Sequence, residues 1–161
     1  MSEENQAPRP PVMVHHQYIR DLSLEIPHAP EIFKENHGEP KINVSVDINA
    51  KHLEENLFCV ELDFHLEGDV ADKKLFILEM AYGGVAALNV PQEHVEPVLM
   101  IEVPHLMFPY ARQAISATMA NGGLPPLMLN PIDFVGMYQA RHPQQPQQSP
   151  QPQGNDNAPQ Q

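Results

Sequence analysis

Two segments in the first half of the chain alternate strictly between apolar and more polar residues. In residues 42–48 and 58–67, every second side chain is apolar. Successive side chains of a β-strand point to opposite faces of a sheet, so each segment predicts a strand with one buried and one solvated face. The apolar positions are Ile42, Val44, Val46, Ile48, Phe58, Val60, Leu62, Phe64 and Leu66.

Weaker alternation on either side of these segments predicts two further strands. One covers about residues 18–26 and is stopped by prolines, and the other covers about residues 74–82 and is ended by Gly83–Gly84. Short turns favour antiparallel pairing among the last three strands. The connection at residues 27–41 is longer, and we expect it to cross over the sheet.

The hydrophobic period changes in the second half of the chain. Prolines can occupy the first turn of a helix, and they predict helices at about residues 92–101 and 105–120. Residues 121–123, Asn-Gly-Gly, are a strong helix stop, and a proline-rich loop leads to a last helix at about 132–141. Strands followed by helices, with one polar sheet face, predict an α+β fold with helices packed on the other face.

The longer predicted helix carries more apolar surface than one sheet layer can cover. At about 100° per residue, two apolar stripes lie side by side along it. One consists of Leu106, Tyr110, Ala114 and Ala117, and the other of Met107, Ala111, Ile115 and Thr118. We therefore expect the stripe that begins at Leu106 to form an oligomer interface.

The 161 residues suffice for one compact domain, which we place at residues 18–142. Residues 1–17 begin with a polar, proline-bearing stretch and predict a flexible N-terminal segment. Residues 143–161 consist mainly of Gln and Pro, which offer little to bury, so they predict a disordered tail.

The net charge of −12 restricts the partners of the chain. It argues against nucleic acid, whose phosphates attract Lys and Arg, and against anionic membrane. The longest charge-free stretch, residues 113–132, contains two glycines and three prolines, so no membrane-inserted segment is predicted. The N-terminus does not resemble a signal peptide, and we expect a cytoplasmic protein.

No catalytic or metal-binding motif occurs in the chain, so we predict neither an enzyme nor a cofactor. The best metal candidate is a run of alternate residues, Glu61, Asp63, His65 and Glu67, but they lie about 7 Å apart along one strand and cannot close a metal shell. They more simply form a solvated acidic face. Cys59 and Ser116 have no neighbouring base that the sequence can assign.

Apolar residues crowd the proline-rich loop and the last helix of this acidic chain. Most belong in a core, but contiguous leftover apolar surface would form an oligomer interface or a binding groove. We expect six residues to line or border such a groove: Phe76, Leu78, Leu124, Leu127, Phe134 and Met137.

Four motifs, in order along the chain, resemble the SecB family of bacterial protein-export chaperones. They are YIRDLSLE-IPHAP at 18–30, FILE with a following Gly-Gly at 76–84, FPYAR at 108–112, and GLPPLMLNPIDF at 123–134. The resemblance implies a four-stranded antiparallel sheet and a homotetramer built as a dimer of dimers. It also implies an ATP-independent holdase, which keeps unfolded precursor proteins export-competent and delivers them to the SecA motor.

The resemblance also assigns a contact for SecA on the exposed face of the sheet. The matching positions are Asp21, Glu25, Ile77 and Glu79. Asp21 and Glu25 share a strand face by alternation, as do Ile77 and Glu79. The alternative function is an oligomeric adaptor that binds a single folded partner, and a small enzyme ranks last.

Overall fold

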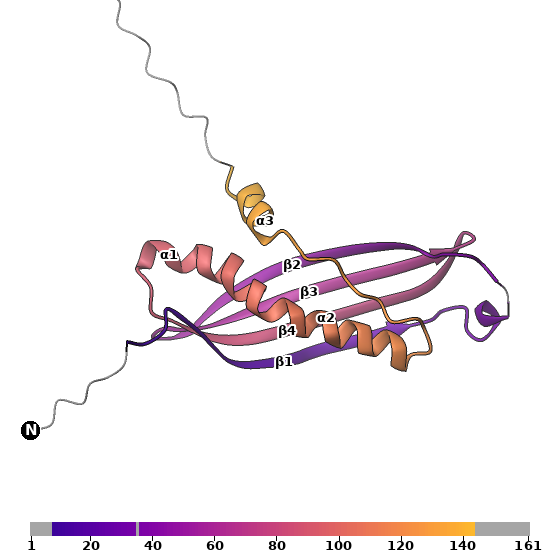
Figure 1. Cartoon of the computed structure of the whole chain (residues 1–161), viewed down its shortest axis with the longest axis horizontal. Coiled ribbons are helices and arrows are strands. Elements are labelled where there is room, and N and C mark those ends of the chain that lie inside the picture. Colours follow the sequence, from indigo (N-terminus) through magenta and orange to yellow (C-terminus); the bar gives the residue numbers. More distant parts are fainter. Residues whose placement is uncertain (1–7, 35, 144–161) are drawn as a thin grey trace, which may run out of the picture.

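Four long antiparallel strands form one sheet in the computed structural model, which describes residues 8–34 and 36–143. The strands are β1 (Val12–Glu25), β2 (Lys41–Glu54), β3 (Leu57–Val70) and β4 (Lys73–Leu88). They lie in the order β1-β4-β3-β2, so β1 and β2 are the edges. The predicted α+β fold with a four-stranded antiparallel sheet is confirmed (Figure 1).

The alternation in the sequence corresponds to the two faces of the sheet. In β3, Val60, Leu62, Phe64 and Leu66 are buried, while the residues between them are partly exposed. The strands are longer than the alternation indicated, because two-residue turns connect them. Residues 55–56 join β2 to β3, and Ala71–Asp72, both with positive φ, join β3 to β4. Such tight turns keep the pairing in register to the strand ends.

Strand β1 begins at Val12, so the prediction that residues 12–17 are flexible is wrong for this part of the chain. These residues pair with the C-terminal half of β4, which supplies their hydrogen-bonding partner. Two register shifts, between Val14 and His16 and between Ile19 and Asp21, mark β-bulges in this edge strand. Residues 1–7 and 144–161, which include the predicted tail, lie outside the described residues.

The connection from β1 to β2 crosses from one edge of the sheet to the other, as expected. It contains a short 3₁₀ helix, η1 (Glu31–Phe33), and passes the end of the sheet (Figure 1).

Strand β4 continues through Gly83–Gly84, where the sequence predicted that it would end. The two glycines make room for neighbouring side chains. A Cβ atom on Gly83 would lie 2.5 Å from the ring of Tyr18, and one on Gly84 would lie 2.8 Å from the sulfur of Met107. Glycine here allows close packing on both faces of the sheet, which is another use of glycine within a strand.

The two helices predicted at 92–101 and 105–120 form one continuous helical rod. It consists of α1 (Gln92–Pro97), a π-helical turn η2 (Val98–Glu102) and α2 (Val103–Asn121). The π turn lies between Pro97 and Pro104, where prolines remove amide donors from the regular helical ladder. The predicted stop is confirmed, because α2 ends at Asn121 and Gly123 adopts a φ of 84°.

The helices and the segment that follows α2 cover one face of the sheet and leave the other open (Figure 1). The segment leads to α3 (Phe134–Arg141), whose N-terminus is capped by the Asp133 carboxylate accepting the Gly136 amide hydrogen at 2.9 Å. The core lies between the sheet and this cover. It includes Leu62 and Leu78 from the sheet and Met107 and Ile115 from α2.

Candidate functional site

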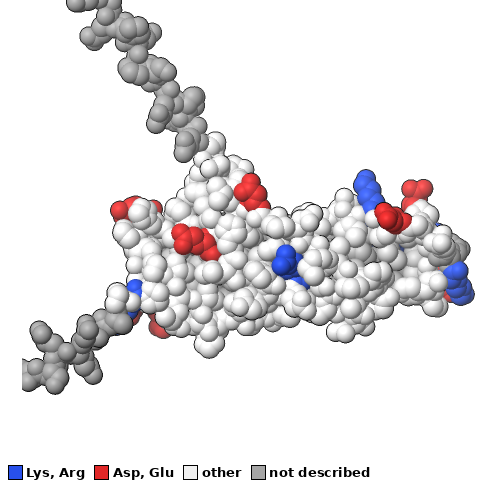
Figure 2. All heavy atoms as spheres, viewed as in Figure 1, with Lys and Arg blue, Asp and Glu red and all other residues white. Residues whose placement is uncertain are grey.

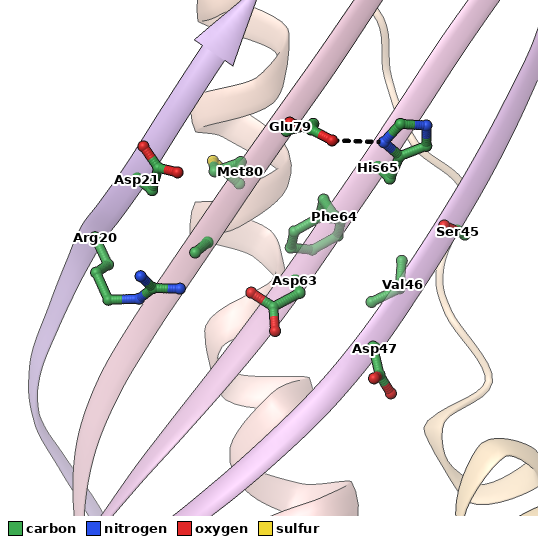
Figure 3. A pocket seen from close by; sticks show the side chains of 11 residues that line it. Arg20, Asp21, Ser45, Val46, Asp47, Asp63, Phe64, His65, Glu79 and Met80 are labelled. Atoms are coloured by element: carbon green, nitrogen blue, oxygen red, sulfur yellow. Dashed lines mark hydrogen bonds and ion pairs between the residues drawn. The ribbon is translucent and has the colours of Figure 1, made fainter.

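The open face of the sheet is a shallow, charged hollow of about 490 Å³ (Figure 3). Its lining residues come from all four strands and include Arg20, Asp21, Asp47, Asp63 and Glu79. No helix covers it, so these carboxylates keep their hydration and remain accessible to a partner. A basic protein surface is the kind of partner that such a face attracts.

The opposite, helical side has a different character. Viewed from this side, the surface carries few Lys, Arg, Asp and Glu side chains: a basic group lies near its middle, and the others lie over its left part and at its right end (Figure 2). On the strands, the acidic residues Asp21, Asp47, Asp63 and Glu79 line the open face instead. The elements on this side expose large apolar side chains such as Leu106, Met128 and Val135. The two sides of one subunit therefore suit partners of different chemistry, a charged one and an apolar one.

Several carboxylates on the open face already have partners within the chain. Arg20 binds Glu61 through two nitrogens, with Nε 2.5 Å from Oε2 and Nη2 2.9 Å from Oε1. This contact raises the pKa of Arg20. Arg141 of α3 reaches the open-face residue Asp47 and donates a 3.0 Å hydrogen bond to the carbonyl oxygen of Ile48. It thereby fastens α3 to the edge strand β2.

A second group of charged residues centres on His65. Its Nδ1 lies 3.1 Å from Oε1 of Glu79, and its Nε2 lies 3.0 Å from Oε1 of Glu67. Lys74 continues the chain of contacts, with Nζ 2.9 Å from both Glu67 and Asp69. The hydrogen bond to Glu67, followed by that to Glu79, raises the pKa of His65 above 6.5, and the Lys74 ammonium lowers the pKa of Glu67.

The four residues assigned to the SecA contact by resemblance share the open face. Glu25 pairs with Ile77 across β1 and β4, and Asp21 lies farther along the same face, opposite Ala81. Within residues 8–34 and 36–143, no hydrogen bond or ion pair engages the side chain of Asp21 or Glu25. Glu79, by contrast, is held by His65. Their role in binding stays a prediction.

Most of the residues expected at the client groove lie in the core. Phe76, Leu78, Leu124 and Phe134 are all buried. The edge-to-face rings of His105 and Phe108 pack against Phe134 at 5.0 and 6.1 Å. Their burial corrects the expectation that these four side chains offer surface to a client, because they belong to the core between the sheet and its helical cover. Leu127 and Met137 are half-buried and remain candidates for the groove border.

The two stripes of α2 have different environments. Met107, Ala111 and Ile115 are buried against the sheet, whereas Leu106 and Tyr110 are 50% and 60% exposed. A groove of about 390 Å³ runs between the exposed stripe and β1, lined by Ala114 and Ala117 together with Ile19. Glutamine and tyrosine side chains also line this groove. An exposed leucine and tyrosine on one helix suit contact with another protein surface.

The residues that sequence reasoning missed are the cationic partners of the open face: Arg20, Lys74 and Arg141. Their contacts join different elements, so no local spacing predicts them. For His65, the alternation predicts only a position on the solvated acidic face of its strand. Its position opposite Glu79 follows from strand register, which the sequence did not specify.

Two further features bear on the chemistry of the described residues. Within residues 8–34 and 36–143, no three His, Cys, Asp or Glu side chains are placed to hold a metal ion, and no helix is long and apolar enough to cross a membrane. Cys59 lies on the open face, 3.4 Å from the hydroxyl of Tyr18, and this contact raises the pKa of the tyrosine.

Residues 4–145 match the model of a family described as preprotein translocase subunit SecB. The chain belongs to the SecB family. The match spans all four strands and the three α-helices, so the family that the motifs resembled is confirmed, and with it a protein-export chaperone as the general function.

Relatives named protein-export protein SecB support this membership. The SecB of Rhodospirillum rubrum is 45% identical over 144 residues, covering 88% of this chain and 90% of that protein. The SecB of Paramagnetospirillum magneticum is 48% identical over 133 residues, covering 82% and 86%. Both matches cover nearly whole proteins.

A solved structure shares the fold at low identity. It is the SecB-like chaperone Rv1957 of Mycobacterium tuberculosis, in complex with a ChAD peptide from the antitoxin HigA1. The similarity has a TM-score of 0.63 at 12% identity and covers 75% of this chain and 90% of that one. At this identity the similarity supports the fold alone.

Proposed function

We propose that this SecB-family chain is an ATP-independent holdase of the cytoplasm that binds unfolded precursor proteins and delivers them to SecA. The division of the subunit into a charged open face and a largely uncharged helical side carries the proposal. The part of the helical side outside the exposed stripe of α2, near Leu127 and Met137, suits unfolded segments, which are recognised by their apolar side chains. The open face suits a folded, basic partner.

Holding should require no nucleotide and no single client sequence. The protein should suppress the aggregation of several unrelated denatured proteins at about equimolar concentration, because apolar contacts carry little sequence specificity. Light scattering during refolding, with and without ATP, measures this. Suppression for one protein only would favour an adaptor with a single folded partner, and a strict need for ATP would contradict a passive holdase.

We further propose that the subunit assembles as a homotetramer through the exposed stripe of α2. Light scattering at micromolar concentration should give four times the subunit mass of 18.1 kDa. Tyr110→Glu should weaken assembly by at least about tenfold, because burying an unpaired carboxylate costs several kcal/mol. Gln92→Glu adds the same charge at an exposed position of α1 and should leave the mass unchanged.

A monomeric mass for the unmodified protein would refute the proposed tetramer. A tetrameric mass for Tyr110→Glu would show instead that the subunits meet through another surface, such as the edge of β1.

A further inference from the structure

His65 occupies a position between two carboxylates on the open face. One ring nitrogen faces Glu79 of β4 at 3.1 Å, and the other faces Glu67 of its own strand at 3.0 Å (Figure 3 draws the first contact). Both carboxylate oxygens are acceptors, so both ring nitrogens can donate only in the imidazolium form. The neutral ring has one donor, and its other nitrogen then presents a lone pair to a carboxylate.

Few other charged groups surround His65 on the neighbouring strands. Directly opposite on β2 is the uncharged Ser45, and Asp47 is the next residue on that face. On β3 itself, Asp63 lies on the other side of His65 from Glu67. On β4, Lys74 engages Glu67 and Asp69 rather than Glu79. Farther away on β1 are Asp21 and Arg20, and Arg20 engages Glu61.

Within residues 8–34 and 36–143, His65 is therefore the one cationic partner of the Glu79 carboxylate. Three acids are assigned to the SecA contact. Within the described residues, Glu79 is the one whose carboxylate contacts a titratable side chain. The side chains of His65 and Glu79 are 43% and 62% exposed, so solvent protons reach the pair freely.

We propose that His65 is a positioning residue that holds Glu79 and neutralises its charge at low pH, and releases it for a basic partner as the pH rises. The inference rests on the proposed function for its partner, SecA. The hydrogen bonds to Glu67 and Glu79 raise the pKa of His65, so the proton is lost at a higher pH than from a free imidazole. Loss of one proton makes the face more negative by one charge, so a basic surface binds more tightly.

The test is the affinity of full-length protein for SecA between about pH 6 and about pH 8.5 at constant ionic strength. The unmodified protein should bind about fivefold more tightly at the upper end, as expected for one unscreened charge near a basic surface. His65→Gln carries no charge at any pH. It should bind more tightly than the unmodified protein at low pH and show a flatter profile.

The expected gain in affinity for SecA distinguishes a positioning role of His65 from a purely structural role, because a variant with a damaged fold would lose affinity. His94→Gln, at an exposed position of α1, is the matched control and should keep the unmodified profile. Titration of groups on SecA contributes equally to all three proteins. Equal pH profiles for the unmodified protein and His65→Gln would overturn the inference.

A second measurement does not involve SecA. In protein with isotope-labelled histidine, the ring signal that is missing from His65→Gln identifies His65 in the NMR spectrum. Its titration midpoint should lie above 6.5 and should fall in Glu79→Gln. An unchanged midpoint would overturn the inference. Absence of SecA binding at every pH would refute the proposed function and the binding step, while a shifted midpoint would still establish the neutralisation of Glu79.

Discussion

Reversing Asp21 and Glu79 to lysine should reduce the affinity for SecA by at least about tenfold, because both carboxylates lie on one face and would repel a basic partner after reversal. The remaining affinity should depend less on salt. Both side chains are exposed, so circular dichroism and the holding of denatured clients should stay unchanged. Binding is measured by titration calorimetry at two salt concentrations.

The control for this double variant is Glu39→Lys with Glu93→Lys. It makes the same change in net charge at exposed positions outside the four strands. It should retain most of the affinity for SecA. If the control lost as much affinity as the double variant, overall charge would explain the binding, and if neither lost affinity, the proposed contact would be wrong.

Phe134→Ala should lower the free energy of unfolding by about 3–5 kcal/mol, as for other large buried aromatic residues. Phe134 is fully buried and begins α3, with the rings of His105 and Phe108 against it. Denaturant unfolding, compared at equal protein concentration, measures the effect. Val135→Ala, at a neighbouring position that is 41% exposed, should change the stability far less.

The combination of stability and client binding decides the role of Phe134. A stable Phe134→Ala variant with weakened client binding would show that Phe134 contributes to the client groove despite its burial. A strongly destabilised variant whose folded fraction still holds clients would confirm that Phe134 serves the core.

The sheet was readable from the sequence because one of its faces is open to water. Each strand of the alternating segments must put its apolar side chains on the covered face, and Leu62 and Phe64 do so. The end of β4 was misjudged, since glycine is also used where other atoms approach the backbone. Only the tertiary contacts of Gly83 and Gly84 with Tyr18 and Met107 distinguish the two uses.

The site was less predictable than the fold. Alternation correctly paired Asp21 with Glu25 and Ile77 with Glu79, because a strand has only two faces, and the strand register brings both pairs to the open face. Whether an apolar side chain is core or surface depends instead on what covers it. Phe134 packs against the rings of His105 and Phe108 on α2, and no local pattern shows this. The pairing of His65 with Glu79 likewise depends on register across two strands.

The edges of the sheet have a consequence for a protein that collects unfolded chains. An edge strand exposes unpaired amide and carbonyl groups, which can recruit further strands and seed aggregates. In β1 two bulges interrupt this run of backbone groups, and in β2 a register shift after His52 interrupts it. The charged side chains of Lys41 and Lys51 also disfavour the pairing of a further strand with β2. A captured polypeptide therefore meets an irregular border, which hinders it from extending the sheet, and the protein can hold aggregation-prone segments without becoming a template for their growth.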